Sequence, residues 1–137
     1  MHATPTATNQ TGASAVEMAL ILPLLLTLVF AIIDYSRFFF VRFTVTAAVA
    51  DAARIAVLPG TTDAMIATAV YGALLDPISQ ASSQTPSVTV TPNQRTAGMP
   101  VTVTASLAFS PLILPQYLGI TLFPQSISAS ATMVVEP

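Results

Sequence analysis

The feature that most constrains this chain is an apolar run near its N-terminus, from Ala13 to Ile33. At about 1.5 Å per residue, a helix of this length covers roughly the 30 Å hydrocarbon thickness of a bilayer. Its only formal charge is Glu17, close to the N-terminal end. The run therefore predicts one transmembrane helix over residues 13–33, with a single acid near the membrane boundary.

The composition agrees with a membrane protein and excludes several other classes. Of the 137 residues, 53% are hydrophobic and only 7% are charged, which is more apolar than a typical soluble domain. The formal net charge is −2 and there is no lysine, so we expect no nucleic-acid partner. The absence of cysteine excludes disulfides and thiolate metal sites.

Glu17 needs an explanation because an acid opposes insertion. On insertion scales a carboxylate at mid-membrane costs about 3 kcal/mol, and less near the interface. One interpretation is an interfacial acid in the first helical turn that reaches the headgroups. The other is a processing signal: Gly12 can lie extended in a protease cleft, and an acid at a fixed offset supplies the register. The chemistry of these residues alone leaves both interpretations open.

A defined series of residues surrounds this acid. The series is Gly12, Val16, Glu17, Ala19, Leu20 and Pro23, with Met18 directly after the acid. It lies in the segment GASAVEMALILPLLLTLVFAIIDYSR, which resembles the leader and hydrophobic helix of the TadE-like pseudopilins of the tight-adherence (Tad, Flp) pilus system. In that family an aromatic residue is more usual at the position of Met18. Two later stretches, TAAVADAARIAV over residues 46–57 and the tail VTVTASLAFSPLILP with ISASATMVVEP, also resemble the family.

The resemblance implies a processed subunit of a pilus. A prepilin peptidase would cut between Gly12 and Ala13, so that residues 1–12 are a leader and Ala13 becomes the new amino terminus. Glu17, Met18 and Pro23 would act in processing and assembly, with Glu17 either pairing with a neighbouring subunit's amino terminus or being recognised during assembly. The implied role is that of a minor pseudopilin needed for pilus assembly, adhesion or biofilm formation. Its implied partners are the peptidase, the other Tad pilus and pseudopilin subunits, and the inner (cytoplasmic) membrane.

The arginines bear on the orientation in the membrane. The leader carries only His2 and the chain amine as cations, whereas Arg37 and Arg42 follow the span. Taken alone, the positive-inside rule would place the C-terminal part in the cytoplasm. We expect that part outside, because Asp34 at i−3 offsets the charge of Arg37 and because prepilin processing requires the leader to be inside.

The helix is predicted to continue beyond the membrane through residues 34–59. This stretch has no glycine or proline before Pro59-Gly60, which is a stop signal, and its Asp34/Arg37 and Asp51/Arg54 pairs have the i,i+3 spacing that supports a helix. One face is predicted to pack on a domain or on sister helices. Its residues are Phe38, Val45, Ala48, Ala52 and Ile55.

Two other features of the long helix have specific expectations. The aromatic cluster FFFVRF over residues 38–43 is interpreted as an interfacial anchor, with a dedicated partner-binding patch as the alternative. Pro23 removes one helical hydrogen bond, and we expect a kink there.

Residues 60–137 predict a small α+β domain outside the cytoplasm. Thr62-Asp63 caps a short helix that ends near Leu75, before Asp76-Pro77. The residues predicted to share one side of it are Met65, Ile66, Val70 and Leu74. After the polar segment 79–86, alternation of apolar and polar residues predicts strands over 87–91, 101–109 and 126–135. The whole chain is therefore predicted to be α+β, with a long helix, a short helix and a three-stranded antiparallel sheet.

The sequence carries no constellation for catalysis. His2 is the only histidine and lies in the predicted leader, and the acids are scattered. We therefore expect no enzyme, no catalytic residues, no metal site, no cofactor and no small-molecule substrate. Besides a processed pseudopilin, the alternative is a permanent single-pass envelope scaffold or binding protein that never enters a filament. A type II secretion pseudopilin shares the leader but not the Ala-Ala-Arg segment or the tail.

Overall fold

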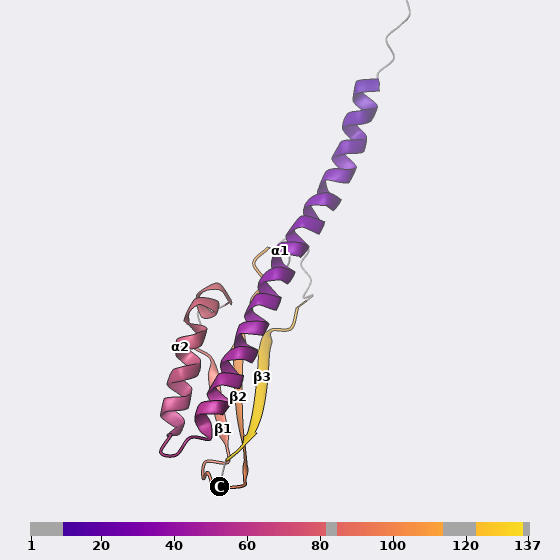
Figure 1. Cartoon of the computed structure of the whole chain (residues 1–137). Coiled ribbons are helices and arrows are strands. Elements are labelled where there is room, and N and C mark those ends of the chain that lie inside the picture. Colours follow the sequence, from indigo (N-terminus) through magenta and orange to yellow (C-terminus); the bar gives the residue numbers. More distant parts are fainter. Residues whose placement is uncertain (1–9, 82–84, 114–122, 136–137) are drawn as a thin grey trace, which may run out of the picture.

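The computed structural model describes residues 10–81, 85–113 and 123–135. In chain order they form α1 (Gln10–Ala56), α2 (Asp63–Ala81), β1 (Ser87–Thr91), β2 (Pro100–Ala108) and β3 (Ser126–Val134). The first half of α1 extends beyond the other elements, whereas its second half lies among them (Figure 1). This architecture confirms the predicted α+β fold and the three predicted strands.

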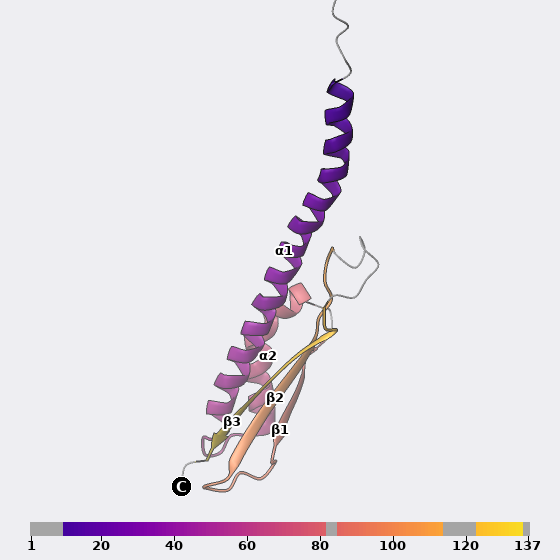
Figure 2. The same cartoon turned by 90° about the vertical axis from the view of Figure 1, so that its right-hand side faces the viewer.

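The sheet places its two faces in different surroundings. Its strand order is β1-β2-β3, and both neighbouring pairs are antiparallel. Both helices lie on one face of the sheet, and the other face is free of helices (Figure 2). Because side chains alternate along a strand, apolar residues point to the helices and hydroxyl residues point away from them. The hydroxyl residues are Ser87, Thr89, Thr91, Thr102, Thr104, Ser106, Ser128, Ser130 and Thr132.

The core lies where the second half of α1, α2 and the sheet meet. Each of these elements contributes fully buried apolar side chains, and α1 also contributes a run of alanines. Small side chains allow two helices to approach closely, so the Ala-rich segment 46–57 serves here as packed core. The buried residues are Val41, Val45, Ala48, Val49, Ala52, Ala53 and Ala56 from α1, Ile66, Val70 and Leu74 from α2, and Val90, Val101, Val103, Ala105, Leu107 and Ile127 from the strands.

The helix ends follow local signals in part. The Met65 N–H donates to the Thr62 hydroxyl over 3.3 Å, which confirms Thr62 as the cap of α2. The chain leaves α1 after Ala56, and Gly60 adopts a φ of 80° that residues with a Cβ rarely take. The predicted end of α2 near Leu75 is wrong, because α2 continues through Pro77 to Ala81. A proline removes only one backbone donor, and the helical backbone persists on both sides of it.

The predicted inner face of each helix is largely confirmed. On α1, Val45, Ala48 and Ala52 are buried, while Phe38 and Ile55 are half-buried. On α2, Ile66, Val70 and Leu74 are buried, but Met65 is 58% exposed, so its predicted position on that side is wrong. Met65 precedes Ile66 by one residue, about 100° around the helix, and therefore points out of the core.

A buried carboxylate fastens the chain after β2 to α1. Asp34 is fully buried, and its two oxygens accept hydrogen bonds from the backbone N–H groups of Leu112, at 3.1 Å, and Ile113, at 3.2 Å. A carboxylate removed from water requires such donors, since burial without partners is strongly unfavourable. Asp34 therefore joins the helix to the end of the sheet nearest the free half of α1.

The predicted i,i+3 pair between Asp34 and Arg37 is wrong. Arg37 instead places Nη1 at 3.4 Å from the Ser110 carbonyl oxygen and its guanidinium carbon 5.8 Å from the centre of the Phe109 ring. The Asp34 carboxylate instead accepts hydrogen bonds from the backbone amides of Leu112 and Ile113, so tertiary contacts replace the local pair. The second predicted pair, Asp51 with Arg54, is present at 3.3 Å and exposed.

Aromatic rings complete this junction. The ring centres of Phe38 and Phe109 are 5.4 Å apart, and those of Tyr35 and Phe123 are 4.7 Å apart. Such distances are those of attractive aromatic pairs. The FFFVRF segment is therefore divided: Phe38 packs toward the sheet, whereas Phe40 is 49% exposed.

A neighbouring pair of leucines tests the core of α2. Leu74 is fully buried and Leu75 is 67% exposed. We expect Leu74→Ala to lower the free energy of unfolding by about 2–5 kcal/mol, because it leaves a cavity. Leu75→Ala should change it by less than about 0.5 kcal/mol. Urea unfolding of the full chain in detergent micelles, followed by tyrosine fluorescence, measures both; equal losses would contradict this placement of α2.

The Asp34 clamp is tested by a change that keeps the size of the side chain. In Asp34→Asn the amide NH₂ replaces one acceptor and faces a backbone N–H, so we expect a loss of about 1–3 kcal/mol in unfolding free energy. Amide hydrogen exchange of Leu112 and Ile113 should become faster. The control Asp51→Asn, in an exposed pair, should cost about 0–1 kcal/mol. Unchanged exchange at both amides would argue against the clamp.

Candidate functional site

The predicted site residues lie on the free half of α1. Gly12, Ala13, Glu17, Met18 and Pro23 all belong to α1 and are exposed. A Cβ built on Gly12 would meet no atom within 4 Å, so nothing in the described residues packs against this glycine. Most of the predicted leader, residues 1–9, lies outside the described residues. The bond between Gly12 and Ala13 thus lies in the first turn of α1, where helix ends fray.

The length, composition and exposure of this half are those of a candidate membrane span. Its most apolar window has a mean hydropathy of 2.6 and is not buried inside the protein, which makes α1 a candidate membrane helix by length and composition. Leu20 and Leu24 are 74% and 73% exposed. A contiguous apolar surface of this kind indicates a lipid or protein partner.

The helix passes through Pro23 without interruption. The Thr27 hydroxyl donates to the Pro23 carbonyl oxygen over 2.8 Å, so this polar side chain is satisfied by its own helix inside the apolar segment. α1 as a whole follows a gentle curve (Figure 2). The kink expected at Pro23 is therefore expressed as part of a smooth bend in a continuous helix.

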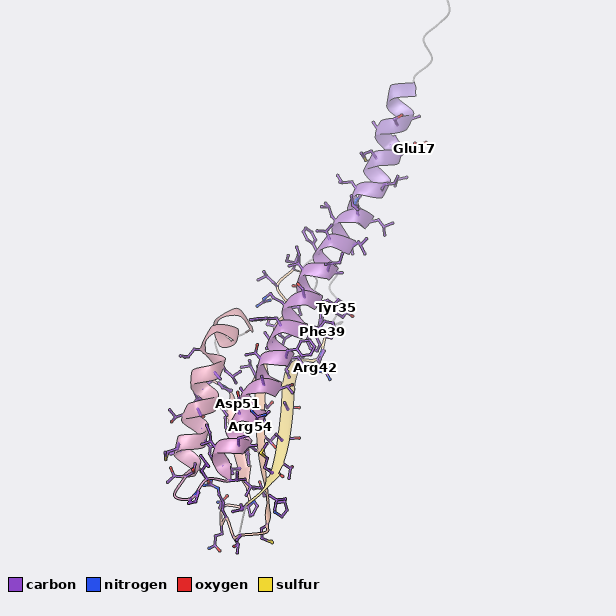
Figure 3. The ribbon with its side chains drawn as sticks, in the orientation of Figure 1. Glu17, Tyr35, Phe39, Arg42, Asp51 and Arg54 are labelled. Atoms are coloured by element: carbon purple, nitrogen blue, oxygen red, sulfur yellow. The ribbon has the colours of Figure 1, made fainter. Side chains whose placement is uncertain are left out.

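One side of α1 gathers the acid, an aromatic stripe and a base. Glu17, Tyr35, Phe39 and Arg42 lie on the same side of the helix (Figure 3). We use the name aromatic stripe for Tyr35, Phe39 and Phe43, whose neighbouring ring centres are 6.3 and 6.4 Å apart. These rings are 45%, 45% and 70% exposed. The stripe is therefore available to lipid headgroups or to a partner helix, as the sequence left open.

The side-chain charges of the domain are mostly engaged within the chain. Besides Asp34 and Arg37, the Arg95 guanidinium donates to the Thr61 carbonyl oxygen and to the Asp63 carboxylate. This contact ties the connection between β1 and β2 to the start of α2, and local sequence patterns do not reveal it. Within the described residues, the side chains of Glu17 and Arg42 have no hydrogen-bond or ion-pair partner (Figure 3).

A cavity lies in the domain, away from the predicted site residues. A cavity of about 680 Å³ lies at the far end of α1, lined among others by Leu58, Gly60, Asn93, Arg95 and Val135. The charged group in its lining, Arg95, is already bound to Thr61 and Asp63. Among the described residues, no group of three or more His, Cys, Asp or Glu side chains could hold a metal ion.

The comparison with protein families matches α1, the helix that carries the predicted site residues. The family model described as TadE-like protein matches residues 12–54. This range runs from the predicted cleavage glycine to the last turn of α1. No curated protein and no solved structure matches the chain. The segment that forms almost all of α1 is therefore similar to the TadE-like family, in agreement with the resemblance seen in the sequence.

Proposed function

We propose that this chain is a minor pseudopilin of a Tad pilus, cleaved by a prepilin peptidase between Gly12 and Ala13. The observation that carries the proposal is the division of α1. One continuous helix, TadE-like over almost its whole length, is apolar and free over its first half and is built into a small domain over its second half. Such a subunit can be held by the membrane through the first half and later packed against other helices through the same surface.

Cleavage would give Glu17 a partner. The new amine of Ala13 lies one helical turn before Glu17, and Ser14 and Ala15 between them have small side chains. In an apolar bundle of helices, an amine and a carboxylate from neighbouring subunits attract each other more strongly than in water. The pairing compensates for an acid that opposes insertion into lipid.

The proposed orientation places the leader in the cytoplasm and the α+β domain outside the inner membrane. Arg37, the first cation after the span, is engaged by Ser110 and Phe109 in the folded domain. Its position just beyond the apolar run therefore fits a role in the junction. The adhesion or biofilm role is part of the same proposal, because it follows from assembly of the pilus.

Gly12 provides the test of processing. We expect Gly12→Asp to lower the mature fraction by about tenfold or more, since a loss of about 1.4 kcal/mol in the transition state for cleavage is sufficient. The matched control is Gly72→Asp, at an exposed glycine on α2 with nothing within 4 Å of a Cβ. Intact-mass and N-terminal analysis of the protein from its native membrane measures the result. A wild-type protein that begins at Met1 beside an active peptidase would instead indicate a permanent membrane anchor.

Glu17 provides the test of assembly. We expect Glu17→Ala to insert and to be processed, but to fall by about tenfold or more in the sheared surface fraction, because one charge-assisted contact is lost. The control Leu24→Ala removes an exposed apolar side chain from the same half of α1 and should change this fraction little. Immunoblots of membrane and sheared fractions compare the two; equal piliation in both variants would contradict the proposed role of Glu17.

A further inference from the structure

β3 forms an open edge of the sheet. It pairs with β2 in one continuous register, and in the part of the chain that the structure describes no strand pairs with its other side. β3 also forms the border of the domain opposite α2 (Figure 1). Proteins usually protect such an edge by keeping the strand short or by placing charges, prolines or bulges on it. The sequence of β3, SISASATMV, is nine residues long and contains neither a charge nor a proline.

The other edge of the sheet differs from this one. β1 has only five residues, and Pro86 and Pro92 flank it directly. A proline lacks the N–H group that a further strand would bind. Extension of the sheet is therefore restricted at β1 and open at β3.

The backbone of β3 presents hydrogen-bonding groups on this open side. Just before β3 begins, the Phe109 N–H donates to the Gln125 carbonyl oxygen over 2.9 Å, so the backbone of Gln125 faces β2. Backbone groups of an antiparallel strand alternate between its two sides. Those of Ser128, Ser130 and Thr132 therefore face away from β2, and these three residues are exposed. They form a row of donors and acceptors that a further strand can use.

α1 supplies a second surface beside this edge. The ring centres of Tyr35 and Phe123 are 4.7 Å apart, and Phe123 shortly precedes β3. From there α1 and β3 run in the same direction (Figure 1). Arg42 lies two helical turns, or about 10 Å, after Tyr35 and therefore on the same side of α1, beside the first residues of β3. Figure 3 shows Tyr35, Phe39 and Arg42 together on this side.

We infer that the open edge of β3 binds an extended segment of a partner protein, which joins the sheet as a further strand. Side chains on one side of that strand face α1, where Tyr35 and Phe39 are each 45% exposed and Arg42 has no ion-pair partner among the described residues. The segment that fits carries apolar residues at alternate positions and an acid at the position beside Arg42. The backbone bonds hold the strand, and the side-chain contacts select it.

A second copy of this chain does not fit the edge. Two β3 strands joined in antiparallel orientation point their α1 helices in opposite directions, because α1 runs along β3 (Figure 1). Copies inserted into one membrane with the same orientation cannot meet in this way. In addition, neither β1 nor β3 contains an acid, so neither edge strand of a second copy supplies a partner for Arg42. The occupant is therefore a different protein.

This inference goes beyond the proposed function and does not depend on cleavage after Gly12. The edge of β3 and the side of α1 that carries Arg42 lie outside the predicted leader and the predicted span. A processed pseudopilin and a permanent membrane anchor therefore present the same binding edge.

Synthetic peptides test the edge directly. The probes are the acetylated and amidated peptide VTETVTVTV and its reversed sequence, which cover both strand directions. In an extended peptide the acid lies on the same side as the valines. We expect one of them to slow amide hydrogen exchange of Ser128, Ser130 and Thr132 by about tenfold or more in the full chain in detergent micelles. Unchanged exchange with both peptides would overturn the inference.

A change in Ser130 isolates the contribution of the backbone. Ser130→Pro removes one outward N–H group, and a proline is tolerated there because that group bonds to no neighbouring strand. We expect the affinity for the peptide to fall by about tenfold. The control Ser130→Ala keeps the N–H group and should bind the peptide as the wild type does. Equal binding by the proline and alanine variants would contradict strand addition.

Arg42 tests the predicted acid, and it does so even if the proline variant fails to fold. For the wild type, replacing the glutamate of the peptide by lysine should weaken binding by about tenfold, because like charges then meet. Arg42→Glu should reverse this preference. The matched control is Arg54→Glu, at an exposed arginine that pairs locally with Asp51, and it should leave the preference unchanged. Equal affinities of the two peptides for the wild type would overturn the role of Arg42.

Cysteine variants test the competing occupant, a second copy. Ser130→Cys and the control Thr89→Cys each place one thiol at an exposed strand position of a chain that has no cysteine. On mild oxidation in the native membrane, we expect equal, low yields of linked dimers. A yield about tenfold higher from Ser130→Cys would assign the edge to a second copy and overturn the inference.

The outcomes also separate this inference from the proposed function. A chain that begins at Ala13 in its native membrane but binds neither peptide overturns the strand addition alone. A chain that still begins at Met1 beside an active peptidase, yet binds a peptide through Arg42, overturns the proposed processing alone.

Discussion

A single continuous helix has to present a candidate membrane span along one half and join a protein core along the other. α1 meets this constraint by changing the side chains that it carries: its second half buries apolar residues on one side and places charged residues such as Asp51 and Arg54 on the exposed side. Its first half presents large apolar residues such as Leu20 and Leu24 to the outside, whereas its second half carries the small residues Ala48, Ala52 and Ala53 where α2 and the sheet approach. Because no loop separates the halves, the position of the membrane segment also determines the position of the domain.

The junction between the halves depends on one buried acid and a group of aromatic rings. Asp34 holds the backbone after β2 against α1, and Phe38, Phe109 and Phe123 pack beside it. A charge that is both buried and hydrogen-bonded has few alternative arrangements. A force applied along α1 is therefore transmitted to the domain through contacts near the membrane boundary, which suits a subunit whose helix is proposed to move during assembly.

The shortage of charges makes the remaining ones informative. With only 7% charged residues, nearly every described charged side chain outside the free half of α1 has a contact that explains it, from Arg95 with Asp63 to Asp51 with Arg54. Glu17 and Arg42 differ in having no such contact among the described residues, and both lie on the exposed side of α1 (Figure 3). A charge that opposes insertion and has no partner among the described residues fits the proposed pairing with another chain.

Local sequence patterns determined the parts of this protein that depend on solvent and on short-range geometry. The span, the cap at Thr62 and the three alternating strands follow from hydrocarbon thickness, hydrogen bonding by a side chain two or three residues away, and the two-residue period of a strand. Tertiary structure decided the contacts between residues far apart in the chain. Asp34 exchanged its predicted local partner for the amides of Leu112 and Ile113, and Arg95 reached Thr61 and Asp63. These contacts form only when the sheet packs on α1 and brings distant residues together. The periodicity of the sequence does not predict which residues those are.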